Sequence, residues 1–310
     1  YLPNCNASAP EIQACSDPVD RSTSDIDTLL RTAFESPTGF NTPVDSSIII
    51  QQLCDHGDFL EIQEERAKNT ITCLGRIGGH VVGFVANNSA VSSGQIDIDA
   101  ALKNARFIRF CNLYNIPVMF LEDTTGFLPG REQEHRGIVQ AGRAMLDAIV
   151  DLRTPRFLIL IRNAFGGAYA SYNNYPTGAD LVVALPTTRV AVMGPAGVEY
   201  VYKDELKAIR AAIPNRTADA KADLMNQGFS DVDADDKASA IASEWAKAAE
   251  IDLAKRYERE IMNPEEALSL GSVSQIVMPS DLRAVIAKHL MFCLRHYTPE
   301  PMGGVQREFH

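Results

Sequence analysis

The chain has 310 residues, of which 29 are Lys or Arg and 40 are Asp or Glu, so its formal net charge is −11. This length fits one large domain or two ordinary ones, and 45% apolar with 22% charged residues is a globular composition rather than a disordered one. The acidic balance argues against a nucleic-acid partner, because phosphate contacts need a basic face.

No stretch reaches the roughly 18 apolar residues of a membrane-spanning helix, and the N-terminus lacks the basic and apolar regions of a signal peptide. The six cysteines form no CxxC pair, so no disulfide framework is predicted. We therefore expect no membrane partner and a location in the cytoplasm, or in the mitochondrial matrix if the source is eukaryotic. The chain begins at Tyr1 instead of Met, which predicts a processed or truncated piece.

In chain order, residues 1–45 are rich in Pro, Ser, Asn and Asp and predict an extended arm or linker with a short helix near 25–34. Residues 46–66 predict a helix followed by a polar turn. Gly78 and Gly79 then separate two β-like runs, 71–77 and 80–86, which is typical of a hairpin.

From residue 99 onward, predicted helices alternate with near-continuous apolar strands, which indicates an α/β fold with a buried, largely parallel sheet. Residues 200–300 are predicted to be mostly helical, with the acidic run 231–236 as a solvated loop. The predicted helices are 99–114, 134–152, a short one from near 168, 236–262 and 279–296, and the predicted strands are 116–122, 156–161, 181–185 and 189–193.

One turn stands out as a candidate site, because Gly166 and Gly167 follow a buried strand and open a helix. Glycine lets a ligand approach the backbone closely, and the first amides of a helix have no acceptor inside it. The amides of Gly167 and Ala168 could therefore stabilise developing negative charge as an oxyanion hole. Tight packing between strand and helix explains this segment equally well.

Two further loops follow predicted strands, where α/β proteins usually bind ligands. In the segment 122–130, Phe127 and Leu128 are too apolar for a plain solvent loop, although they could simply anchor it. In the segment 192–197, Val192 and Met193 precede a turn that, by itself, is better explained as structural. There is no HExxH, phosphate loop, GxGxxG or Gly-x-Ser-x-Gly motif, so no metal site or side-chain nucleophile is predicted.

Taken together and in this order, several stretches resemble the C-terminal half of the carboxyltransferase (beta) subunit of biotin-dependent acyl-CoA carboxylases, the family of propionyl-CoA carboxylase and transcarboxylase. Each motif is weak alone, but the ordered set is specific and covers nearly the whole chain. The matching stretches are 1–3 with Asn6, 75–77, 83–87, 97–100, 105–111, 126–130, 133–135, 164–169, 191–194, 263–264 and 278–281.

The resemblance implies a crotonase-like ββα spiral over residues 46–310, with the arm 1–45 and a helical C-terminal region. It implies carboxyl transfer between carboxybiotin, on a separate carrier protein, and the α-carbon of an acyl-CoA substrate, with this chain facing biotin. The implied partners are an N-terminal carboxyltransferase half, a biotin carboxyl carrier protein and biotin carboxylase, in a hexamer built as a dimer of trimers. Two alternatives stay open: a subunit of an acyl-CoA decarboxylase, and a non-catalytic assembly domain.

The resemblance also implies roles for single residues. Related propionyl-type enzymes carry an acidic residue where this chain has Ala170, so a larger acyl group is an open alternative to propionyl or acetyl. The implied site comprises Gly167 and Ala168 as donors to the biotin ureido oxygen, Gly166 for close approach, and Phe127, Leu128, Tyr169, Ala170, Val192 and Met193 as substrate-binding residues.

Overall fold

The computed structural model describes residues 1–301, which separate into two compact units: residues 1–190 with 264 onward, and residues 191–263. Residues 302–310, the end of the predicted spiral domain, lie outside the described residues. The elements of the first unit are α1 (Ser24–Glu35), α2 (Ser46–Leu53), β1 (Phe59–Glu61), β2 (Thr70–Ile77), β3 (His80–Asn87), α3 (Ile98–Leu113), β4 (Val118–Thr124), α4 (Arg131–Arg136), α5 (Ile138–Val150), β5 (Arg156–Phe165), α6 (Gly166–Ser171), β6 (Leu181–Ala184), β7 (Arg189–Ala191, whose last residue belongs to the second unit), α10 (Pro264–Ser269), β8 (Gln275–Ile276) and α11 (Leu282–His296).

An eight-stranded sheet forms the centre of the first unit, in the order β1-β2-β3-β4-β5-β6-β8, with β7 paired to β5. The pairs from β3 to β8 are parallel, whereas β1, β2 and β3 pair antiparallel. Ile77 pairs with His80 across Gly78 and Gly79, whose φ angles are 58° and 82°, so the predicted hairpin is confirmed. The α/β class with a largely parallel sheet is confirmed as well.

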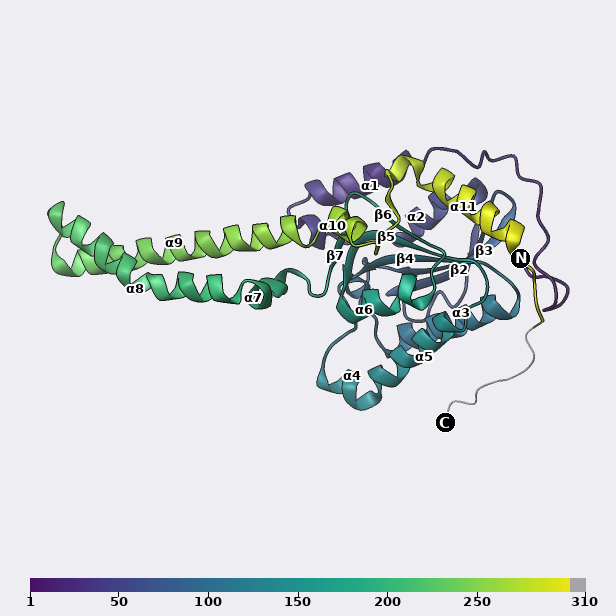
Figure 1. The fold of residues 1–310 in the computed structure, drawn as a ribbon, viewed down its shortest axis with the longest axis horizontal. Helices are drawn as coiled ribbons and strands as arrows, with labels where there is room; N and C mark the ends of the chain where they lie inside the picture. Colours follow the sequence, from purple (N-terminus) through teal and green to yellow (C-terminus); the bar gives the residue numbers. More distant parts are fainter. Residues whose placement is uncertain (302–310) are drawn as a thin grey trace. The chain divides into compact units, whose positions relative to one another are not determined.

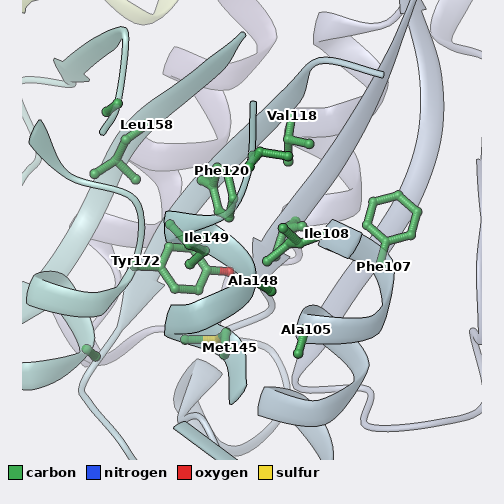
Figure 2. Close-up of a cluster of buried hydrophobic side chains, with 14 of the residues drawn as sticks. Ala105, Phe107, Ile108, Val118, Phe120, Met145, Ala148, Ile149, Leu158 and Tyr172 are labelled. Atoms are coloured by element: carbon green, nitrogen blue, oxygen red, sulfur yellow. The ribbon is translucent and has the colours of Figure 1, made fainter. Parts of the chain in front are cut away.

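Two apolar layers cover the two faces of this sheet. Helices α3, α5 and α6 lie on one face and α1, α2 and α11 on the other (Figure 1). Side chains alternate along β4, so Phe120 enters the first layer, while Met119 and Leu121 enter the second. Figure 2 shows the first layer, here called the α3–α5 layer, where Phe120 lies beside Tyr172 and Ile149.

Several boundaries differ from the prediction, among them three near Gly137 and Gly166. The helix predicted over 134–152 is divided into α4 and α5 at Gly137, whose φ of 94° cannot continue a right-handed helix. Strand β5 runs on to Phe165, and α6 begins at Gly166 rather than near residue 168. Apolar periodicity predicted these helices and this strand but not where they begin and end, because the backbone geometry of single residues sets the ends. No helix among the described residues is long and apolar enough to span a bilayer.

The second unit consists mainly of two long helices that pack along each other, and its elements are α7 (Val198–Val201), α8 (Lys203–Asn226) and α9 (Asp231–Glu260). The solvated loop predicted over 231–236 is wrong, because α9 begins at Asp231 with Ser230 as its N-cap. Acidic side chains are favourable in a first helical turn. In addition, Lys221 of α8 lies 3.1 Å from both Asp231 and Asp235.

A buried ionic cluster fastens the N-terminal segment to the last helix. Arg283 of α11 is 0% exposed, and its guanidinium lies 2.6 Å from Asp55 and 3.3 Å from Asp17. Burial by itself would raise the pKa of Asp55, but hydrogen bonds from the Gly79 amide and Arg283 outweigh it, so the pKa is lowered. The short helix expected near 25–34 is confirmed as α1, while the domain boundary at residue 45 stays a prediction.

Replacing Arg283 by Met should lower the free energy of unfolding by about 3 kcal/mol or more at neutral pH, because the buried Asp55 carboxylate loses its cation, while Asp17 keeps its ion pair with Arg21. Urea unfolding followed by circular dichroism measures this loss. Because the pKa of Asp55 is lowered in the folded protein, the unmodified chain has this stabilisation at pH values above the ordinary pKa of about 3.9. The stabilisation, and with it the difference from Arg283→Met, fades as the pH falls through the pKa of Asp55 in the folded state.

The matched control is Lys288→Met, since Lys288 is exposed on the same helix and should change stability by less than about 0.5 kcal/mol. Equal effects of the two substitutions would contradict a structural role for the ionic cluster.

Candidate functional site

A β-bulge marks the carboxyl ends of the two central strands. Glu122 pairs with Leu160, and the next pair along is Thr124 with Ala164. Between these pairs, β4 advances by two residues and β5 by four. A bulge of this kind bends the strand and re-aims the side chains inside it.

Within the bulge, Arg162 turns toward Asp123 and forms a buried ion pair. Its Nε and Nη2 atoms lie 3.0 and 2.7 Å from Asp123 Oδ2, and the two side chains are 2% and 1% exposed. The other carboxylate oxygen accepts the Asn163 amide at 3.2 Å. The guanidinium also donates to the Thr42 carbonyl and the Ser89 hydroxyl, at 2.8 and 2.9 Å. Four chain segments are thus held together immediately before the glycine turn.

The glycine turn itself joins β5 to α6. Gly166 has a φ of 58°, which L-residues other than glycine adopt only at a cost. Gly167 is exposed, and a Cβ placed on it would meet no atom within 4 Å. No side chain caps the helix at Phe165. Ala168 is 1% exposed and packs into the α3–α5 layer, so the turn combines an anchored side and an open side.

The loop after β4 is anchored at its middle. The Ile96 amide donates to the Gly126 carbonyl at 3.0 Å, and the Leu128 amide donates to the Ile96 carbonyl at 2.9 Å. The ring of Phe127 packs so closely on Gly142 of α5 that a Cβ there would lie 3.2 Å from it. Since β4 and β5 are parallel neighbours, this loop and the glycine turn leave the same edge of the sheet.

The remaining predicted residues divide between the two units. Tyr169 and Ala170 are on α6. Burial, followed by the charge of Glu122, raises the pKa of Tyr169 to about 12. The side chain of Ala170 is exposed. Val192 and Met193 belong to the second unit, where Val192 is 87% exposed and the Met193 carbonyl accepts the Tyr257 hydroxyl at 2.9 Å. The predicted residues of the glycine turn and α6 therefore lie in the same unit as Phe127 and Leu128, whereas Val192 and Met193 lie in the other.

Sequence reasoning missed three ionisable residues at this edge: Glu122, Asp123 and Arg162. All three are at most 2% exposed. A signal was present, because Glu122 and Arg162 each follow directly on an uninterrupted apolar run and Asp123 is next to Glu122. A charge in such a place needs a partner or must be neutralised. Within residues 1–301, no group of three or more His, Cys, Asp or Glu side chains is arranged to hold a metal ion.

Comparison with known proteins identifies the family of the chain. A family model for the carboxyl transferase domain matches residues 1–300. The propionyl-CoA carboxylase carboxyltransferase subunit of Haloferax mediterranei is 34% identical over 285 residues, which cover 91% of this chain and 47% of that protein. Methylmalonyl-CoA decarboxylase subunit alpha of Propionigenium modestum is 36% identical over 285 residues, with the same two coverages.

Among solved structures, the transcarboxylase 12S hexamer with hydrolysed methylmalonyl-CoA bound matches with a TM-score of 0.78 at 28% identity, covering 100% of this chain and 51% of that chain. The predicted crotonase-like fold is thereby confirmed. The chain spans about half the length of the relatives that it matches.

The two glycines of the turn should respond differently to alanine. Gly166→Ala should lower the free energy of unfolding by about 1–2 kcal/mol, because alanine is strained at a φ of 58°. Gly167→Ala should leave stability unchanged or raise it by up to about 1 kcal/mol, because its Cβ enters open space inside a helix. Equilibrium urea unfolding of both variants measures this, and equal effects would contradict the backbone geometry described here.

Proposed function

Because this chain belongs to the carboxyl transferase domain family, we propose that it supplies the biotin-facing half of a site for carboxyl transfer between carboxybiotin and the α-carbon of an acyl-CoA. The observation that carries the proposal is the turn at Gly166 and Gly167, which is open on one side and fixed on the other by the Asp123–Arg162 pair. An assembly domain without catalysis would not need this open turn.

The residues present fit a biotin ring in two respects. Gly167 leaves room above the backbone, and the amides of Gly167 and Ala168, at the start of α6, have no acceptor inside the helix. Carboxybiotin supplies the carboxyl group, and its ureido oxygen gains negative charge as the bond from nitrogen to the carboxyl carbon breaks. The two amides would donate to that oxygen, and Gly166 would let the ring approach. Such fixed donors stabilise a transition state without an acid or base side chain.

We assign the neighbouring side chains to substrate contact. Phe127 and Leu128 would form one wall, with Tyr169 and Ala170 on α6. The substrate-binding role that the resemblance implies for Val192 and Met193 stays a prediction for the second unit. Ala170 is small, uncharged and exposed, which leaves room for a larger acyl group than propionyl.

The partners proposed are an N-terminal carboxyltransferase half that holds acyl-CoA, a biotin carboxyl carrier protein and biotin carboxylase, in a hexamer. The bacterial and archaeal relatives support the cytoplasm as its compartment.

A second candidate function is the reverse reaction, transfer of a carboxyl group from an acyl-CoA to biotin. The relative named methylmalonyl-CoA decarboxylase subunit alpha favours it, at 36% identity. One site would serve both directions, because an enzyme lowers the same barrier from either side.

Gly167→Val should reduce carboxyl transfer about 100-fold or more, because its branched side chain would occupy the space over the turn and keep the oxygen from the amides. The effect should be at least as large as the loss of one oxyanion donor. The assay follows labelled carboxyl groups from a carboxylated carrier to propionyl-CoA in the assembled complex, with native mass spectrometry reporting assembly. Ala218→Val, on an exposed position of α8, is the control. Transfer by Gly167→Val within twofold of the unmodified protein would remove the turn from the mechanism.

The isolated chain should carboxylate neither propionyl-CoA nor acetyl-CoA, since the half proposed to hold acyl-CoA is not part of residues 1–310. Addition of the N-terminal carboxyltransferase half should restore transfer. Sustained turnover by the purified chain alone would show that it binds both substrates, and would overturn this division of the site.

A further inference from the structure

The carboxyl group of Glu122 is buried in the first unit without a hydrogen-bond partner among the described residues. Glu122 is 0% exposed on β4, and neither of its carboxyl oxygens has a hydrogen-bond partner among the described residues. Along the strand it follows Phe120 by two positions, so it points to the same face, into the α3–α5 layer. A buried polar group without a partner is costly, and such exceptions call for an explanation.

This carboxyl lies in the layer on which α6 rests. Tyr172, directly after α6, is also 0% exposed and its hydroxyl has no partner among residues 1–301. The Tyr172 and Phe120 rings meet edge to face at 5.8 Å, and Figure 2 shows Tyr172 beside Phe120 and Ile149. Burial raises the pKa of Tyr172, and the charge of Glu122 raises it further, as it does for Tyr169 on α6.

The charged and titratable groups around Glu122 give it no cation. On its own strand lies Asp123, on α6 lies Tyr169, and directly after α6 lies Tyr172; the ionised form of each of these groups is negatively charged. Arg162 of β5 is committed to Asp123, and Lys103 of α3 donates to the carbonyls of Arg66 and Thr70 at 2.8 Å each. Burial, followed by the negative charge of Asp123, raises the pKa of Glu122 well above its ordinary range.

We propose that Glu122 is a positioning residue for the glycine turn: as a neutral acid it keeps the layer beneath α6 closed, and its ionisation opens that layer and displaces the amides of Gly167 and Ala168. The claim that ionisation of Glu122 opens the layer beneath α6 rests on the burial of its carboxyl group and on the lack of hydrogen-bond partners among the described residues. Its link to carboxyl transfer rests on the proposed function.

Hydrogen exchange tests the opening of this layer without any activity. In the open state Glu122 has an ordinary pKa of about 4.3, so between that value and its raised native pKa the opening constant should rise about tenfold per pH unit. Exchange of the peptide that contains Gly166–Ser171, measured by mass spectrometry from pH 6 to 9 and corrected for intrinsic rates, should lose protection accordingly. In Glu122→Gln and in Glu122→Leu the corrected protection should not depend on pH.

The matched control is Glu134→Gln, because Glu134 is exposed on α4 and should keep the pH dependence of the unmodified chain. Infrared difference spectra against Glu122→Gln should show a protonated carboxyl at neutral pH in the unmodified chain. Protection that is independent of pH in the unmodified chain, or absence of that carboxyl band, would overturn the proposal.

The link to catalysis is tested by pH profiles of transfer to propionyl-CoA in the assembled complex. Transfer by the unmodified protein should fall at alkaline pH, and Glu122→Gln should extend the active range upward. Identical profiles would remove Glu122 from the site. If no protein of the set transfers carboxyl groups, the proposed function fails, and the exchange data still decide the role of Glu122.

Discussion

The ion pair between Asp123 and Arg162 is the constraint on which the rest of the candidate site depends. Taking two charges out of water is expensive, and the cost is offset only where geometry is good and the remaining donors are satisfied. Here Nε and both terminal nitrogens of the guanidinium donate to a carboxylate, a carbonyl or a hydroxyl at 2.7 to 3.0 Å. Loss of one partner alone would leave the other buried and charged, so the two residues act as a unit.

The Asp123–Arg162 ion pair also explains why the chain leaves the two central strands where it does. Without a side chain that bonds to other segments, the bulge between the Glu122–Leu160 and Thr124–Ala164 pairs would be only a local irregularity of the sheet. With Arg162 in the bulge, the ends of β4 and β5 are tied to the segments that carry Thr42 and Ser89. The backbone of the following turn therefore starts from a fixed point, which is what preorganised amide donors require.

The sequence predicted what local chemistry decides and missed what depends on register. The hairpin at Gly78 and the glycine turn at Gly166 were predictable, because both need conformations that favour glycine. The partnership of Asp123 with Arg162 joins residues 39 positions apart, and no periodicity reveals it. The start of α9 at Asp231 was missed for a related reason: its acidic run looks solvated until Lys221 of the neighbouring helix is placed beside it.

The strand period of two explains why the adjacent acids Glu122 and Asp123 differ so much. Asp123 faces Arg162 and is paired, while Glu122 faces the apolar layer, where burial favours its neutral form. A free carboxylate beside the turn would compete for the amides of Gly167 and Ala168, and it would repel negative charge developing on a ureido oxygen. With one acid paired to a cation and burial favouring the neutral form of the other, neither would oppose that charge. In the site proposed here, backbone amides would stabilise the developing charge, so an unpaired carboxylate beside the turn would be especially unfavourable.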